Sequence, residues 1–225
     1  DFKNGQFSGT GKQFNENGVL LYEGLFRDGL YHGEGTLFRG NGSKYISGKW
    51  VFGKPHGSVQ FYFPDNGLLQ YEGGLKKMDD GSFVFQGQGT LYNQTGQSVY
   101  QGLWEVGTRS GNGTAWLEDG SIYSGNWVDD YPDGKGTYLF PDGTEYEGGF
   151  IRGKKHGQGT FKEADGFVSY DGEWKDGQRF GKGRVNKRDS SSYDGDWLDG
   201  KPHGNGMFTY PDGRVYTGTM KQGLR

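Results

Sequence analysis

The feature that most constrains the fold is a short motif, tyrosine-x-glycine, which returns at almost constant spacing along the 225-residue chain. In the second half of the chain the intervals are 23, 23, 24, 23 and 23 residues, for the tyrosines Tyr100, Tyr123, Tyr146, Tyr170, Tyr193 and Tyr216. Less regular copies begin at residues 22, 46 and 71. Repetition at this period predicts an array of small, similar elements that are stable only when they stack on their neighbours.

The motif indicates one repeat array over residues 1–225, with no separate domains. Eight repeats occupy residues 22–215, and partial repeats occupy 1–21 and 216–225. The array is irregular at 65–90, where one repeat carries about five extra residues and has Leu75 in place of the usual tryptophan or phenylalanine. Insertions in repeat arrays often form loops that contact partners. A structurally harmless bulge is the alternative.

Each repeat has the pattern of a β-hairpin. Tyr123, Gly125 and Trp127 alternate with other residues, which is the two-residue period of a strand. A second run rich in β-forming residues, GTYLF, comes next at 136–140, and the turn sequence PDG comes after it at 141–143. We therefore predict an all-β fold with negligible helix, in which the hairpins stack into one elongated antiparallel sheet of about 16 strands, roughly 75–80 Å long.

The composition indicates what must hold such a sheet together. The chain has 46 glycines, and aromatic residues make up 16% of it. Glycine loses more backbone entropy on folding than other residues, so the sheet is intrinsically weak. Glycines such as Gly125 and Gly136 allow neighbouring backbones to approach closely. We predict that the aromatic residues at the first and fifth positions of the motif lie on one face and form a continuous core by stacking on the next repeat.

The clearest repeat, YDGDWLDGKPHGNGMFTYPDGRV at 193–215, resembles the membrane occupation and recognition nexus (MORN) repeat family. The resemblance covers essentially the whole chain. It implies stacked hairpins and a non-enzymatic adaptor that organises cytoskeletal, ciliary or membrane-apposed assemblies, in some members by self-association. It also implies a cytoplasmic location at the cytoskeleton, a cilium or a membrane.

The stretch GKKHGQG at 153–159 resembles an anion-binding or catalytic loop, but its histidine belongs to the repeat. It lacks the spacing of a phosphate-binding loop. All four histidines precede a glycine at the same position of a repeat: His32, His56, His156 and His203. Other repeats place serine, aspartate, phenylalanine or glutamine there, so we interpret this position as a turn or packing element. No catalytic residue, metal site or cofactor is predicted, and the chain has no cysteine.

The predicted activity is binding of a partner protein segment, extended or helical, in a groove lined by aromatic residues, which commonly anchor interfaces. Unpaired sheet edges also suggest a homodimer. A spacer without a groove ligand remains the alternative. The predicted groove residues are Phe26, Trp50, Trp104, Trp127, Phe150, Trp174, Trp197, Tyr100, Tyr123, Tyr146, Tyr170 and Tyr193.

Direct binding to anionic phospholipid is the second hypothesis. It requires clustered cations, each worth about 1 kcal/mol near an anionic surface. The candidates are Lys76, Lys77, Lys154, Lys155, Lys187 and Arg188. The net charge is −3, which gives no general attraction to lipid or nucleic acid, and we predict no nucleic-acid partner. No apolar run approaches the ~20 residues that span a bilayer. The stretch RVNKRDSSS at 184–192 lacks the usual Asp-Gly turn and is interpreted as a solvated loop, a phosphorylation site or a basic contact.

Overall fold

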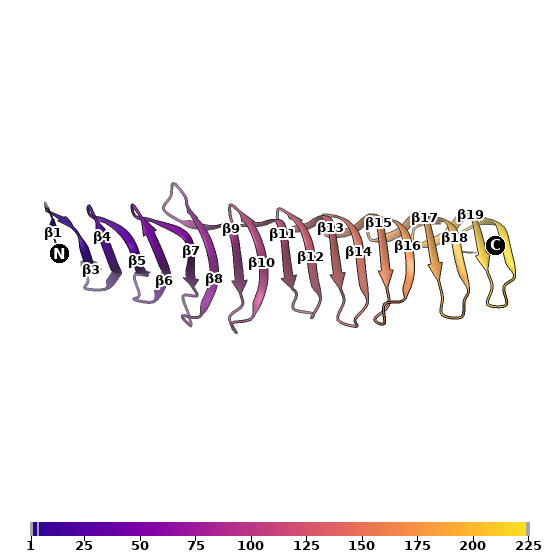
Figure 1. Cartoon of the computed structure of the whole chain (residues 1–225), viewed down its shortest axis with the longest axis horizontal. Coiled ribbons are helices and arrows are strands. Elements are labelled where there is room, and N and C mark those ends of the chain that lie inside the picture. The colour runs from indigo at the N-terminus through magenta and orange to yellow at the C-terminus, as the bar shows by residue number, and fades with distance from the viewer. Residues whose placement is uncertain (1, 4, 224–225) are drawn as a thin grey trace. The chain divides into compact units, whose positions relative to one another are not determined.

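The computed structural model describes residues 2–3 and 5–223, and these residues form β-strands, turns and no helix. Contacts divide the chain into two compact units, residues 1–110 and 111–225. Within each unit consecutive strands pair antiparallel in chain order, as the successive arrows of Figure 1 show. The predicted all-β fold of stacked antiparallel hairpins is confirmed.

The N-terminal unit begins with two very short strands that pair with each other, and the sheet runs from β3 to β10. Its strands are β1 (Phe2–Lys3), β2 (Gln6–Phe7), β3 (Gly9–Phe14), β4 (Leu20–Arg27), β5 (Leu30–Phe38), β6 (Lys44–Val51), β7 (Lys54–Tyr62), β8 (Leu69–Lys77), β9 (Phe83–Tyr92) and β10 (Ser98–Glu105).

The C-terminal unit repeats one hairpin with nearly identical register. Its strands are β11 (Thr108–Trp116), which begins just before the division between the units, β12 (Ile122–Val128), β13 (Tyr131–Leu139), β14 (Glu145–Ile151), β15 (Lys154–Lys162), β16 (Val168–Lys175), β17 (Gln178–Asn186), β18 (Ser192–Leu198), β19 (Lys201–Thr209) and β20 (Val215–Met220).

Two kinds of turn alternate along the sheet. Within a hairpin, two residues connect the strands, as Arg152 and Gly153 do between β14 and β15. Both have positive φ, 47° and 79°, which matches the twist of a hairpin. Between hairpins the turn is longer: the N–H of Phe140 donates to the carbonyl of Thr144, and the carboxylate of Asp142 accepts the N–H of Thr144 at 2.9 Å. Gly143 is next to it, at φ 84°.

The stretch at 184–192 keeps this longer turn although it lacks the Asp-Gly sequence. Asp189 accepts the N–H of Ser191 at 2.9 Å, and the N–H of Lys187 donates to the carbonyl of Ser191. Ser190 occupies the glycine position with φ 66°. The turn is therefore set by the aspartate side chain, and a non-glycine residue tolerates the left-handed conformation here.

The insertion in the irregular region lengthens a hairpin. The strands β8 and β9 pair Lys76 with Val84, as an ordinary hairpin would, and continue through one further pair, Lys77 with Phe83. The two-residue turn is replaced by a turn at 78–82, in which Asp80 accepts the N–H of Ser82. In Figure 1 the connection between β8 and β9 extends beyond the neighbouring turns. Its role in partner contact stays a prediction.

The core forms where each motif tyrosine lies flat over two paired glycines. Gly125 pairs with Gly136 across the hairpin of β12 and β13. A Cβ atom on Gly136 would lie 2.4 Å from the hydroxyl oxygen of Tyr123, and one on Gly125 would lie 2.5 Å from the Cα of Gly136. The Tyr123 hydroxyl then donates to the carbonyl of Asn126 at 2.9 Å. The ring fits only because both residues beneath it lack side chains.

The fifth-position ring links one repeat to the one before it. The indole N–H of Trp127 donates to the carbonyl of Gly113 in β11 at 3.1 Å, while its ring meets Tyr123 edge-on at 5.1 Å between centroids. Tyr123 in turn meets the Phe150 ring of the next repeat at 5.1 Å. Repeated edge-to-face contacts of this kind make a ladder of rings, as predicted, and stabilise the stack beyond simple burial.

The first prediction tests the glycine beneath a tyrosine. We expect Gly35→Ala to lower the free energy of unfolding by about 2–3 kcal/mol, because an added methyl group overpacks the core and would lie 2.1 Å from the Tyr22 hydroxyl oxygen. The matched control is Gly40→Ala, since a Cβ there meets nothing within 4 Å. Chemical denaturation measures both, and equal losses in the two variants would contradict the packing of the ring on the glycine.

The second prediction tests the ring ladder. Trp127 is 3% exposed, whereas Trp116 in the same unit is 36% exposed. We expect Trp127→Ala to destabilise the protein by about 3–5 kcal/mol, because it removes a buried ring from a packed core. Trp116→Ala should cost clearly less. Thermal melting followed by circular dichroism makes the comparison, and an unchanged midpoint for Trp127→Ala would show that the ladder is not the core.

Candidate binding groove in the C-terminal unit

The motif histidines lie at a backbone bulge. In β15, Gly159 pairs with Gly148 but His156 pairs with the next residue, Gly149, so the backbone between them bulges out. Gly157, directly after the histidine, has φ 67°. The glycine at this place has positive φ in all eight hairpins: Gly33, Gly57, Gly87, Gly111, Gly134, Gly157, Gly181 and Gly204. The described residues contain no group of His, Cys, Asp and Glu arranged to hold a metal ion.

The residue before the histidine position covers the motif tyrosine, and we call this the cover position. In the N-terminal unit Tyr31 stacks on Tyr22 with centroids 3.8 Å apart, and Phe85 stacks on Tyr71 at 3.9 Å. Each also meets the tryptophan of the next repeat edge-on. The eight cover residues are Tyr31, Pro55, Phe85, Arg109, Pro132, Lys155, Arg179 and Pro202.

Two adjacent cover positions of the C-terminal unit carry cations. The ammonium of Lys155 lies 5.1 Å from the ring centroid of Tyr146 and 4.8 Å from that of Trp174. The rings of Phe140 and Phe161 lie 4.9 and 4.7 Å away. Burial among these rings, and secondarily the charge of Arg179, lowers the pKa of Lys155 from 10.5 to about 8. The ammonium is therefore held where solvation is poor.

Arg179 occupies the equivalent place one repeat further on. Its guanidinium lies 4.8 Å from the ring of Tyr170 and 5.3 Å from the ring of Trp197. Burial lowers its pKa, although Tyr170 and Glu163 oppose the shift. Cation–ring contacts of this kind are attractive, and more so when the cation is desolvated. Both cations therefore have ring partners in place of water.

Two pockets adjoin at Arg179 on this face. One, of about 350 Å³, is lined by Phe161, Trp174 and Arg179 among others. The other, of about 330 Å³, is lined by Arg179 and by apolar side chains that include Val185 and Phe208. The two share Arg179 and Gly200, and we call them together the cation groove. Its floor is aromatic or aliphatic and its charge is positive.

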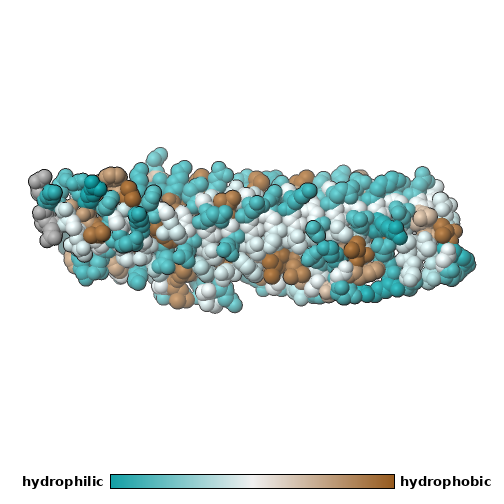
Figure 2. All heavy atoms as spheres, viewed as in Figure 1, coloured by the Kyte–Doolittle hydropathy of each residue, from teal (hydrophilic) through white to brown (hydrophobic). Residues whose placement is uncertain are grey.

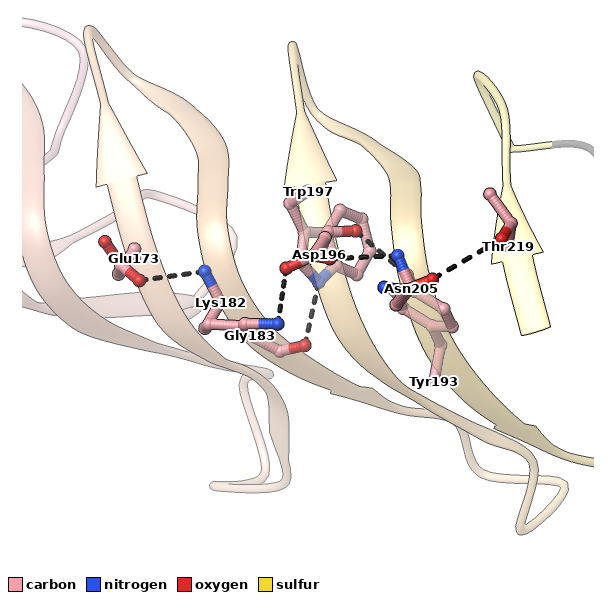
Figure 3. A network of polar contacts seen from close by, with 8 residues as sticks. All are labelled: Glu173, Lys182, Gly183, Tyr193, Asp196, Trp197, Asn205 and Thr219. Carbon is pink, nitrogen blue, oxygen red and sulfur yellow. Dashed lines mark hydrogen bonds and ion pairs between the residues drawn. The ribbon is translucent and has the colours of Figure 1, made fainter. Parts of the chain in front are cut away.

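The opposite face of the same strands is polar, and its charges are paired (Figure 3). The carboxylate of Glu173 accepts the backbone N–H of Lys182 at 2.8 Å, and the Lys182 ammonium lies 2.6 Å from Asp196. Asp196 also accepts the backbone N–H of Asn205 at 2.9 Å, and Thr219 contacts the Asn205 side chain. Hydrogen bonding from Lys182 lowers the pKa of Asp196. The charges of Glu173, Lys182 and Asp196 therefore have partners on the same face.

Exposed hydrophobic side chains form no single band on the face shown in Figure 2, where they occur as separate patches among hydrophilic residues. Several of them, including Phe52, Val106 and Val128, lie in or beside two-residue turns. The recesses therefore give a better indication of a binding site than the patches do.

All the predicted groove aromatics are buried core residues, between 0 and 6% exposed. Trp174, Tyr193 and Trp197 form part of the pocket walls. The contact of these aromatics with a partner stays a prediction. The twelve residues are Phe26, Trp50, Trp104, Trp127, Phe150, Trp174, Trp197, Tyr100, Tyr123, Tyr146, Tyr170 and Tyr193.

Two of the three predicted pairs of lipid-binding cations contain residues with different surroundings. Lys154 is exposed, whereas its neighbour Lys155 is half-buried among rings. Arg188 forms an ion pair with Asp165 at 2.7 Å, while Lys187 lines the cation groove. Lys76 and Lys77 are exposed at the end of β8. Lipid contact through any of them stays a prediction.

Sequence reasoning missed the cover position as a class. Its members are tyrosine, phenylalanine, proline, lysine and arginine, so no residue type marks it. The signal that locates it is its fixed place, two residues before the bulge glycine. Lys155 was identified only as half of a basic dipeptide, and Arg179 was not identified.

The fold defines a class of protein built from stacked β-hairpin repeats, here with a recess on one face of the C-terminal unit. A family model described as MORN repeat matches residues 1–19, 22–44, 47–68, 100–122, 123–145, 146–167, 170–185 and 193–213. The chain therefore belongs to the MORN repeat family, whose repeats are generally non-enzymatic modules for interaction with proteins or membranes. No curated protein matches the chain.

Among solved structures, the chain is similar to the wild-type TCP10 domain of Danio rerio CPAP, with 16% identity over 94% of this chain and 89% of that one, at a TM-score of 0.28. A point mutant of that domain is 14% identical over 93% of this chain and 94% of that one, at a TM-score of 0.31. A streptogramin B lyase is 10% identical over 96% of this chain and 70% of that one, at a TM-score of 0.16. TM-scores this low support no argument about this chain.

Among the described residues, no helix is long and apolar enough to cross a membrane.

The third prediction concerns the pH dependence of stability. The pKa of Lys155 is 10.5 in an ordinary environment and about 8 in the folded protein. Between these values the unfolded chain binds more protons, so stability rises with pH. We expect the wild type to gain stability relative to Lys155→Met as pH rises from about 7 to about 10. Urea denaturation at constant ionic strength measures this, and parallel pH profiles would contradict it.

Proposed function

We propose that this protein is a non-enzymatic scaffold that binds a segment of a partner protein in the cation groove of the C-terminal unit. The observation that carries the proposal is the groove itself, where two pockets meet at Arg179 above an aromatic floor. Arginine and large aromatic residues are the side chains that most often anchor protein interfaces. Membership of a family of interaction modules supports the same assignment.

The site favours a segment of chain over a small molecule. Its two pockets are lined by residues of the strands from β15 to β20 and are open to solvent, so they suit a ligand that extends over several repeats. We place the scaffold in a cytoskeletal, ciliary or membrane-apposed assembly, a setting supported by the family alone. Self-association into a homodimer and binding to anionic lipid remain further hypotheses.

The fourth prediction uses two adjacent residues on opposite faces of β19. Phe208 lines the groove, whereas Met207 is exposed on the other face. We replace each in turn with the photoreactive residue benzoylphenylalanine and irradiate the protein in an extract of cells that make it. We expect protein adducts from position 208, mapped by mass spectrometry to one short segment of a partner, and few from position 207.

Equal adducts from the two positions would contradict recognition by the groove. Adducts of position 208 with lipid alone would favour the membrane hypothesis. Circular dichroism of each modified protein shows whether the sheet is intact before the adducts are compared.

A further inference from the structure

We propose that the partner segment is acidic and that Lys155 and Arg179 receive two of its carboxylates. The inference rests on the proposed function and deepens it, because it names the chemistry that the groove selects. Its basis is the position of two cations, recessed among rings, on a face where the fold itself does not require charge.

The fold does not need a cation at the cover position. Tyr31 and Phe85 fill this place with stacked rings, and Pro132 and Pro202 fill it with short aliphatic side chains. The hairpins that carry proline keep the same glycine pairing and bulge as those that carry a cation. Covering the tyrosine therefore explains an apolar residue here but not the charges of Lys155 and Arg179.

The two cations also lack a carboxylate partner of the kind that Lys162 and Lys182 have on the polar face. Among the described residues, no carboxylate forms an ion pair with Lys155 or Arg179, whereas Lys162 and Lys182 each do form one. The nearest acidic influence is Glu163, which acts on Arg179 through space only. Burial and, secondarily, repulsion by Arg179 on the neighbouring repeat lower the pKa of Lys155. A bound carboxylate would relieve both the repulsion and the poor solvation.

The spacing of the cations suits an extended segment. Lys155 lies on β15 and Arg179 on β17, two strands apart, which corresponds to about 10 Å across the sheet. A polyproline-like segment has three residues per turn and a rise of about 3.1 Å per residue. Side chains three positions apart on such a segment point the same way and lie about 9 Å apart. We therefore infer acidic residues at positions i and i+3.

The groove beyond Arg179 suits a hydrophobic residue of the same segment, adjacent to the acidic residue that Arg179 receives. Its walls there are apolar and include Val185, Phe208 and Met220. Asp199 and Lys187 lie near the rim, one acidic and one basic, and so do not change the positive sign of the recess.

A flat bilayer surface matches this site poorly. Lys155 and Arg179 lie among rings, whereas the exposed lysine next to Lys155 on the same strand is Lys154. A narrow segment of chain can reach recessed cations more readily than the plane of a membrane can.

The experiment selects short random peptides displayed on phage against the immobilised full-length chain. Enriched peptides are synthesised with a fluorophore, and their binding is measured by fluorescence anisotropy. The test variant carries Lys155→Met and Arg179→Met, which keep an unbranched apolar side chain over each ring but remove both charges. The control is Lys154→Met, on the same strand but exposed. Circular dichroism and thermal melting establish that all the variants fold.

We expect the enriched peptides to carry two acidic residues three positions apart, with a hydrophobic residue to one side of the pair. Their affinity should fall by about tenfold or more in the double variant, because charge-assisted hydrogen bonds are lost, and should be unchanged in Lys154→Met. Enriched peptides without acidic residues, or with equal affinity for the double variant, would overturn the inference and leave the proposed function standing. A selection that enriches no peptide would overturn both.

Flotation with vesicles of phosphatidylcholine and phosphatidylserine in equal parts provides the remaining comparison. Wild-type protein should stay unbound at the salt concentration at which the selected peptides bind. Flotation that the double variant abolishes and Lys154→Met does not would assign the two cations to a lipid headgroup and overturn the acidic protein segment as their ligand.

Discussion

The structure depends on one contact, a tyrosine ring lying over a pair of glycines on neighbouring strands. The ring occupies the space that two Cβ atoms would need, as at Tyr146 over Gly148 and Gly159. Burial raises the pKa of that tyrosine to about 12, so its hydroxyl remains a hydrogen-bond donor, and it binds the carbonyl of Gly149 at 3.0 Å. The contact therefore requires glycine at both positions beneath the ring and tyrosine above them, and it sets the register of the hairpin.

This contact also explains where variation is tolerated. The glycines cannot change without displacing the ring, and the fifth-position ring is fixed by its edge-to-face contacts and, when it is tryptophan, by its bond to a glycine carbonyl, as Trp174 has with Gly159. The cover position has no such constraint, because it only has to lie over a ring. Residues as different as Pro132, Lys155 and Phe85 meet that requirement. Recognition can therefore vary at this position while the fold stays the same.

The sequence was sufficient to predict the hairpin, its repetition and the ring ladder, because each depends on a fixed spacing of distinctive residues. It was insufficient where different residue types adopt the same local conformation or occupy the same position. The turn at 187–191 keeps its form with Ser190 at φ 66°, since the aspartate side chain supplies the hydrogen bonds that define the turn. The insertion after Leu75 lengthens a hairpin because its added residues continue the strand pairing. The cover position carries no residue signature, so Arg179 could be recognised only from its place over a ring.

The aromatic residues that sequence analysis favours for binding a partner are also the residues on which the stability of the fold most depends. Trp174 contributes an edge to the groove, yet it is also bonded to Gly159 and packed against Tyr146. A partner therefore gains little by displacing it, and its loss would disturb the sheet before it disturbed binding. The ammonium of Lys155 and the guanidinium of Arg179 have no such structural role, since uncharged residues perform the same covering elsewhere. Stability thus depends on positions of each repeat other than the cover position, and under our proposal specificity is carried by the cover residues that vary.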